Sequence, residues 1–163
     1  RFIAALASMV LAVLRVIMVR HGESENNVLM AISQEAFANH RKVDPSLSPK
    51  GEHQAAAAGQ YFLPSAGNAV DCIVTSPVRR ALQTARPIAA ATGCQPCVWT
   101  DIFEVGGMWM DDAAQPGIRR SDLEAEFPGY QAPPEVGEQG WYDVRQGIES
   151  EGMACARAQA VAQ

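Results

Sequence analysis

Histidine is scarce in this chain, and cysteine is not arranged as a metal site. Only three histidines occur in 163 residues, and none follows His53. Of the four cysteines, only Cys94 and Cys97 are closely spaced, and no second C-x-x-C or H-x-x-x-H completes a zinc or redox motif. Such cysteines are typical of reduced thiols in an intracellular protein, so we expect no metal and no cofactor.

An excess of basic residues and the common nucleotide-binding loops are also lacking. The formal net charge of -5 disfavours a nucleic-acid or anionic-membrane partner. Neither G-x-G-x-x-G nor G-x-x-x-x-G-K-[ST] occurs, which argues against a nucleotide-binding α/β domain. The composition, 48% hydrophobic and 19% charged, fits a single globular domain. An anionic ligand would therefore need a local cluster of Arg and His.

The apolar run near the amino end is shorter than the roughly 20 residues that span a bilayer. We interpret residues 1–14 as an apolar extension and residues 15–163 as one domain, expected to be cytoplasmic and without a membrane span. Because the chain begins with Arg1 rather than Met, a fragment or an extended gene model starting at Met9 is an alternative. A signal peptide is another, although its A-x-A-like site, Ala5 to Ala7, precedes most of the apolar run.

Short apolar segments alternate with helical segments along the chain. Residues 16–19 end in Arg20-His21-Gly22 and predict a strand buried on both faces, and residues 71–75 and 97–100 predict two more strands. Helices are expected from Ser48-Pro49 to Phe62 and from Ser76-Pro77 to Gly93, with a kink at Pro87. This alternation predicts an α/β fold with a mainly parallel sheet flanked by helices, whose ligands bind at the carboxyl edge.

Three further segments have their own patterns. Residues 28–43 have helical character and are interpreted as an insertion beside the site. Residues 107–146 are rich in Gly and Pro and predict a lid or insertion, apart from a short helix opened by a Ser121 and Glu124 capping box. Residues 149–163 predict a helix with one apolar face made of Met153, Ala156, Ala160 and Val161.

The residues around His21 suit phosphoryl chemistry. A neutral imidazole can attack phosphorus and divide one slow displacement into two easier ones. Arginine donates bidentate hydrogen bonds to phosphate oxygens, glycine permits close backbone approach, and serine and asparagine add neutral donors. His40 and His53, by contrast, are expected on helix surfaces.

Three ordered motifs resemble the histidine phosphatase superfamily (branch 1, phosphoglycerate mutase-like). Arg20 to Ser24 with Asn27 is similar to its R-H-G-E-x-x-x-N signature, and Leu47 to Gly51 is similar to its L-S-x-x-G helix start. Thr75 to Ala85 is similar to its T-S-x-x-x-R-A-x-Q-T-A segment. The resemblance implies a phosphoglycerate mutase-like fold and a small phosphorylated substrate.

The resemblance also implies a role for each matching residue. His21 would be the phosphorylated nucleophile, Arg20 and Arg80 would clamp the phosphate, and Ser24 and Asn27 would line it. Glu104, just after the third expected strand, would donate a proton to the leaving group. A glutamate suits this role when apolar neighbours or a negative phosphate keep it protonated. Arg79 would be the more exposed member of the arginine pair.

The family's second catalytic histidine has no counterpart in this sequence. The resemblance puts it in a late strand ending in His-Gly, between the strand before His21 and the strand at residues 71–75. We therefore expect a C-terminally truncated domain lacking that strand, and little activity. The leading interpretation is a phosphomonoester hydrolase acting through phosphohistidine. The alternatives are mutase-type phosphoryl transfer, which Asn26 disfavours because an aromatic residue usually stands there, or an impaired phospho-ligand-binding module.

Overall fold

The computed structural model describes residues 14–163, whereas residues 1–13, which contain most of the expected apolar extension, lie outside the described range. The described helices are α1 (Glu25–Ile32), α2 (Gln34–His40), α3 (Pro49–Tyr61), α4 (Arg79–Thr92), α5 (Arg120–Glu126) and α6 (Glu151–Val161), with 3-10 turns at Pro64–Ala66 and Val144–Gln146. The described strands are β1 (Val74–Thr75), β2 (Cys97–Val98), β3 (Trp109–Met110) and β4 (Ala113–Ala114).

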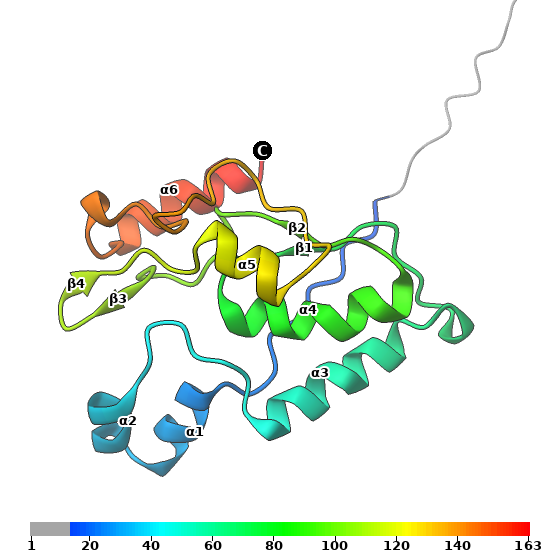
Figure 1. Cartoon of the computed structure of the whole chain (residues 1–163), viewed down its shortest axis with the longest axis horizontal. Coiled ribbons are helices and arrows are strands. Elements are labelled where there is room, and N and C mark those ends of the chain that lie inside the picture. The colour runs from blue at the N-terminus through cyan, green and yellow to red at the C-terminus, as the bar shows by residue number, and fades with distance from the viewer. Residues whose placement is uncertain (1–13) are drawn as a thin grey trace, which may run out of the picture.

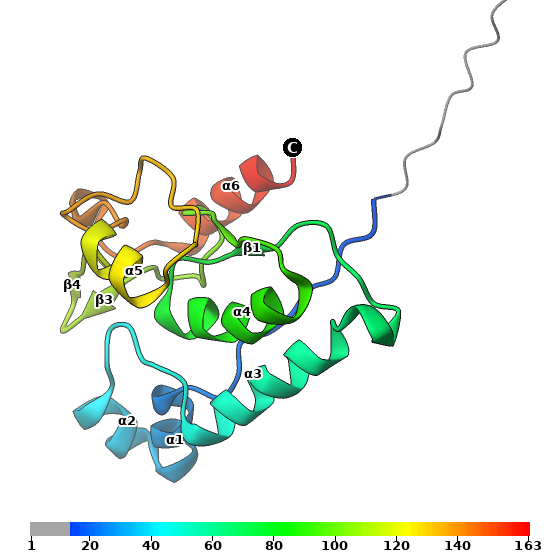
Figure 2. The same ribbon diagram turned by 45° about the vertical axis from the view of Figure 1, so that its right-hand side comes forward.

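The second and third expected strands form a short parallel pair. β1 pairs with β2 in parallel, with Val74 opposite Cys97 and Thr75 opposite Val98. In both ribbon views α4 lies between this pair and α3 (Figures 1 and 2). The α/β arrangement agrees with the expectation, but both strands are shorter than the patterns predicted. β3 and β4 form a separate antiparallel hairpin that the sequence did not indicate.

Two helix boundaries follow the sequence signals. The Ser48 hydroxyl caps α3 by accepting from the Gly51 N–H at 3.1 Å, and Pro49 is the first helical residue. Gly93 ends α4 in a left-handed conformation, with φ of 75°. α3 and α4 pack closely because Gly59 has no side chain: a Cβ there would lie 2.8 Å from the carbonyl oxygen of Pro87. His53 on α3 and His40 on α2 are exposed, as expected.

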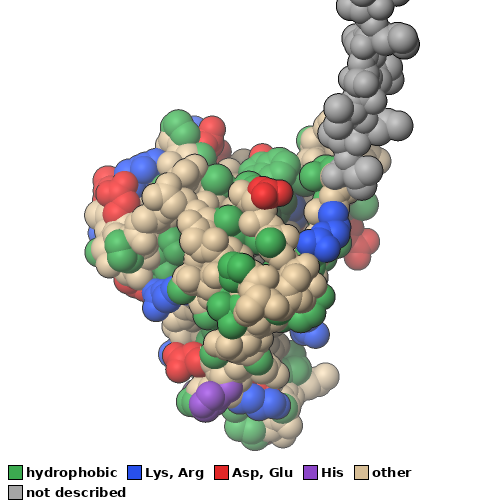
Figure 3. Space-filling model, turned by 90° about the vertical axis from the view of Figure 1, so that its right-hand side faces the viewer, with side chains coloured by type: hydrophobic (Ala, Val, Ile, Leu, Met, Phe, Trp, Pro, Cys, Tyr) green, Lys and Arg blue, Asp and Glu red, His purple; other side chains and the backbone are tan. Residues whose placement is uncertain are grey.

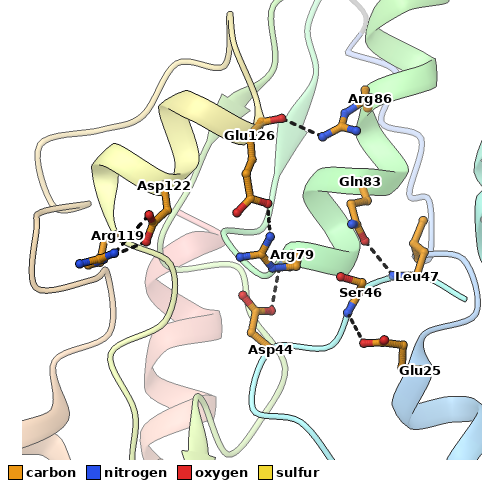
Figure 4. A network of polar contacts seen from close by, with 10 residues as sticks. All are labelled: Glu25, Asp44, Ser46, Leu47, Arg79, Gln83, Arg86, Arg119, Asp122 and Glu126. Carbon is orange, nitrogen blue, oxygen red and sulfur yellow. Dashed lines mark hydrogen bonds and ion pairs between the residues drawn. The ribbon is translucent and has the colours of Figure 1, made fainter.

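The expected caps at Ser76 and Ser121 are wrong. α4 begins two residues later than Pro77, and its first N–H, from Arg79, donates to Asp44 Oδ1 at 2.8 Å (Figure 4). α5 begins at Arg120 without a side-chain cap, and Ser121 donates from both its N–H and its hydroxyl to Glu138. In both places a carboxylate from a distant segment replaces the local acceptor that the pattern proposed.

The segment at residues 107–146 is part of the core rather than a lid. It supplies seven of the ten residues in the main buried cluster, and α4 and β2 supply most of the rest. The cluster is Val78, Leu82, Val98, Met108, Ile118, Leu123, Phe127, Val136, Trp141 and Tyr142. Glycine and proline suggested an irregular flap, yet the large apolar side chains between them are buried. They pack against the buried face of α4.

The expected strand at residues 16–19 is also wrong for the described chain. These residues form no strand, and Val16 and Met18 are 71% and 93% exposed. A strand requires a hydrogen-bonded neighbour, and no segment within residues 14–163 pairs with this one. Hydrophobic side chains reach the surface at several places on the face that Figure 3 shows.

The last helix is present, but its expected apolar face is not buried. α6 begins after Ser150, whose hydroxyl accepts from the Met153 N–H, and Ala154 is its only buried residue. Met153, Ala156 and Ala160 are exposed. The helix is held instead by a polar contact between Arg157 and Glu149. No helix within residues 14–163 has the length and apolar character that a bilayer span requires.

Candidate active site

The loop carrying His21 is clamped between the starts of α3 and α4. The Gly22 N–H donates to Thr84 Oγ1 at 3.1 Å, and the Thr84 hydroxyl in turn donates to the Arg80 carbonyl at 2.7 Å. On the other side, Gly22 lies against Gly51, and a Cβ on either glycine would collide with backbone atoms. The two glycines that the motifs singled out are therefore required by the close approach of these segments.

The ring of His21 has both nitrogens engaged. Nδ1 lies 2.7 Å from the Gly22 carbonyl oxygen, which can only accept, so Nδ1 has the proton and Nε2 has the lone pair. Nε2 accepts from Arg80 Nε at 3.2 Å. Burial lowers the pKa of His21 below 6.5, the Gly22 carbonyl opposes this, and the charges of Arg80 and Arg20 lower it further. The neutral imidazole is therefore favoured, with its lone pair on Nε2.

Arg80 joins His21 to Glu104. Its Nη2 donates to Glu104 Oε2 at 3.0 Å, while its Nε contacts the imidazole. The Arg80 side chain is 12% exposed, whereas that of Glu104 is 79% exposed. These three residues, separated by up to 83 positions in sequence, thus form one chain of contacts. Glu104 is therefore not buried among apolar side chains.

Ser24 and Asn27 are paired with each other at the start of α1. The Ser24 hydroxyl donates to Asn27 Oδ1 at 3.0 Å, and the Ser24 N–H donates to the same oxygen at 2.9 Å. Ser24 is 2% exposed and caps α1. The carbonyl end of the Asn27 amide is therefore oriented by Ser24. Both residues line the cavity beside His21.

Two cavities meet at His21. One, of about 390 Å³, extends from Arg20, His21 and Arg80 toward α1, α2 and β3. The other, of about 420 Å³, lies between the same loop and α3. Arg20, His21 and Asn27 line both cavities. Arg20 is exposed, so its guanidinium is accessible to a ligand in either one.

Arg79 belongs to a neighbouring network rather than to the site. Its guanidinium pairs with Glu126 of α5, whose backbone carbonyl also accepts from Arg86 (Figure 4). Its N–H donates to Asp44, whose carboxyl lies in the loop before α3. As expected, Arg79 is the more exposed of the two arginines. The network fixes the start of α4 and thereby the position of Arg80.

Several residues of the cavity of about 390 Å³ were not identified from the sequence. Met30 and Phe37 come from α1 and α2, Arg41 and Lys42 follow α2, and Trp109 lies in β3. Arg41 donates to the Trp109 carbonyl at 2.7 Å, and its guanidinium carbon lies 3.7 Å from the centre of the Trp109 ring. No local motif marks these residues, because the contact joins positions 68 apart. Within residues 14–163 no cluster of three or more His, Cys, Asp or Glu could bind a metal ion.

The chain is similar to a known protein family and to several known phosphatases. Residues 16–162 match the sequence model of the histidine phosphatase superfamily (branch 1). A broad-specificity phosphatase of Saccharomyces cerevisiae is 36% identical over 72 residues, which cover 44% of this chain and 28% of that protein. The ecdysone phosphate phosphatase of Bombix mori, solved with tungstate, has a TM-score of 0.55 at 15% identity, over 86% of this chain and 64% of that one.

A mycobacterial glucosyl-3-phosphoglycerate phosphatase is 24% identical, with a TM-score of 0.48 over 87% of this chain and 58% of that one. The chain therefore spans less than two thirds of each of these three proteins.

Proposed function

Since the chain belongs to the histidine phosphatase superfamily (branch 1), we propose that its site is that of a phosphomonoester hydrolase acting through a phosphohistidine intermediate. The observation on which the proposal depends is the orientation of His21. Its Nδ1 is bonded to the Gly22 carbonyl, and its Nε2 lone pair faces Arg80. A small phosphorylated substrate would enter the cavity at Arg20 and Arg80.

In the first step, His21 Nε2 attacks phosphorus. A bond forms between Nε2 and phosphorus, and the ester P–O bond breaks. Arg20 and Arg80 bind the phosphoryl oxygens as charge redistributes over them. Arg80 Nε donates a hydrogen bond to His21 Nε2 in the free site. For Nε2 to attack, the Arg80 guanidinium must therefore donate to the phosphoryl oxygens instead. The Asn27 amide, oriented by Ser24, adds a neutral donor.

Glu104 is the proposed proton donor to the leaving oxygen. It lies next to Arg80, so a phosphate bound by Arg80 also lies near this carboxyl. The negative charge of the bound ester would favour protonation of this carboxyl. Apolar burial would not contribute, because the Glu104 side chain is 79% exposed. In the second step water attacks phosphorus, its proton passes to Glu104, and the N–P bond breaks. The products are the free alcohol, inorganic phosphate and the original imidazole.

We also propose that full activity needs a second histidine, on a strand that pairs with residues 16–19. Two observations support this. Among the described residues His21 is the only histidine lining either cavity. Residues 16–19 are apolar, exposed and unpaired there, and Val74 on the nearby β1 is 48% exposed. A further transition-state donor commonly changes the rate by about 100 to 1,000-fold.

Hydrolysis of p-nitrophenyl phosphate by two forms of the protein tests the proposal. The first form is the 163-residue chain, and the second is a version extended through a strand that ends in His-Gly. We expect turnover about 100 to 1,000-fold higher in the extended form, abolished by His21→Ala but retained in His53→Ala, whose imidazole is exposed on α3. Robust turnover by the 163-residue chain that His21→Ala removes would refute the need for a second histidine.

A further inference from the structure

The cavity beside His21 is larger than a phosphate group requires. Its volume of about 390 Å³ falls in the range of about 300–1,000 Å³ typical of sites that enclose whole organic ligands. One end contains His21 and Arg80, and the other lies between the α1–α2 pair and the β3–β4 hairpin (Figure 1). An ester bound with its phosphoryl group at His21 would therefore extend its leaving group toward α1, α2 and β3.

The polar groups at this far end are already paired within the protein. Lys42 Nζ donates to Glu25 at 2.6 Å, and the Asn26 amide exchanges hydrogen bonds of 2.8 and 2.9 Å with the Lys42 backbone. Arg41 donates to the Trp109 carbonyl. The Nε atom of Arg41 has no partner in the described part of the chain, but it is buried and not accessible to a ligand. A polar leaving group would find few unpaired groups here.

Apolar surface, by contrast, is exposed at the same end. Met30 is 49% exposed on α1, a helix with no buried residue, and Val105 is 59% exposed on the opposite wall. Between them Phe37, Arg41 and Trp109 are stacked, with the Arg41 guanidinium carbon 5.5 Å from the Phe37 ring centre and 3.7 Å from that of Trp109. Arg41 holds these two side chains at the cavity wall, where the aromatic rings of Phe37 and Trp109 offer apolar surface to another ring.

We propose that this site selects monoesters whose leaving group is apolar, and best those with an aromatic ring. The ring would lie against Met30, Phe37 and Trp109 while the phosphoryl group contacts His21, Arg20 and Arg80. This inference rests on the proposed function and adds the class of substrate. It makes Met30 and Phe37 specificity-determining residues that contact the leaving group and take no part in the chemical steps.

Binding of two non-hydrolysable phosphonates, measured by calorimetry on the full chain, tests this inference. Phenylphosphonate and methylphosphonate share the phosphoryl group and differ in the ring. We expect the phenyl compound to bind about tenfold more tightly or better, given the apolar carbons it buries. Met30→Ser should reduce this ratio, and so should Phe37→Ala. Ile32→Ser is the matched control, because Ile32 is 69% exposed on the same helix and does not line the cavity.

The possible outcomes separate the two proposals. A preference for phenylphosphonate that Met30→Ser reduces and Ile32→Ser preserves supports the inference. Equal affinity for both compounds would overturn it while leaving the phosphate site intact, as would a preference unaffected by both Met30→Ser and Phe37→Ala. If neither compound binds, the phosphate site itself is refuted, and the inference with it.

Discussion

The contact between Glu149 and Arg157 gives the largest expected effect on stability. Arg157 Nε and Nη2 donate to the two carboxylate oxygens of Glu149 at 2.7 Å each. The Glu149 side chain is 5% exposed and the Arg157 side chain 16%. The guanidinium also lies 3.6 Å from the Phe103 ring centre and donates to the Asp101 carbonyl. The pair thus fixes α6 against the segment that leads to Glu104.

Removing one partner should cost far more than removing both. Glu149→Ala leaves the Arg157 charge largely buried without its partner, and Arg157→Met leaves a buried carboxylate. Each should lower the free energy of unfolding by about 3–5 kcal/mol, the usual cost of breaking a buried pair. The double variant Glu149→Leu with Arg157→Met should recover much of this loss, because an apolar pair of similar volume needs no desolvation of charge.

Urea unfolding followed by tryptophan fluorescence measures these free energies. The control is Arg145→Met, which breaks the exposed pair with Asp143 and should cost less than about 1 kcal/mol, since the Arg145 side chain is 87% exposed. The reasoning fails if Glu149→Ala costs no more than Arg145→Met, or if the double variant is less stable than both single ones.

Three further predictions follow from the contacts around the site. Gly51→Ala should lower the free energy of unfolding in urea by about 1–3 kcal/mol, because the added Cβ would collide with the Glu23 backbone. Gly152→Ala on α6 is the control and should not, since its nearest neighbour would be Ser150 Oγ at 4.0 Å. Arg80→Gln should raise the pKa of His21, measured by NMR titration, because the Arg80 charge helps to lower it; an unchanged or lower value would contradict the geometry.

The third prediction concerns Asp44, whose pKa is raised above 3.8, mainly by burial. The protonated carboxyl therefore contributes to the stability of the folded state. This contribution is complete below pH 3.8 and is lost as pH rises through the pKa of the folded state. Wild type should therefore lose stability relative to Asp44→Asn as pH rises from 3.8, and a constant difference would refute this.

The site was more predictable than the fold around it. Ordered motifs indicated His21 and Arg80, and the resemblance added Glu104. The three lie in contact although they are far apart in sequence. The close approach of Gly22 and Gly51, one glycine from each of two motifs, helps to bring the segments together. The α3 cap also followed from sequence, since Ser48 and its acceptor role are local. The start of α3 was thus predictable, because its cap depends only on neighbours up to three positions away.

Other features depend on distant neighbours that no motif marks, and these were not predictable. The apolar run at residues 16–19 has a strand pattern, yet burial requires partners that no described segment supplies. Ser76 was a reasonable cap, but Asp44 from another loop serves the Arg79 N–H instead. The contact between the Arg41 guanidinium and the Trp109 ring likewise joins two segments that are far apart in sequence, and the sequence pattern of neither segment predicts it. In each case a tertiary contact decides the outcome.

The central claim is that His21 accepts a phosphoryl group on Nε2, and trapping that group tests it most directly. The 163-residue chain and the extended form would each be mixed with p-nitrophenyl phosphate that contains radioactive phosphorus, quenched in alkaline detergent and separated from small molecules. We predict label on the protein that is stable in alkali, released by acid and located on His21 by peptide mapping. His21→Ala should abolish it, and His53→Ala should not. A protein that takes up no acid-labile label, or keeps it in His21→Ala, would contradict the account.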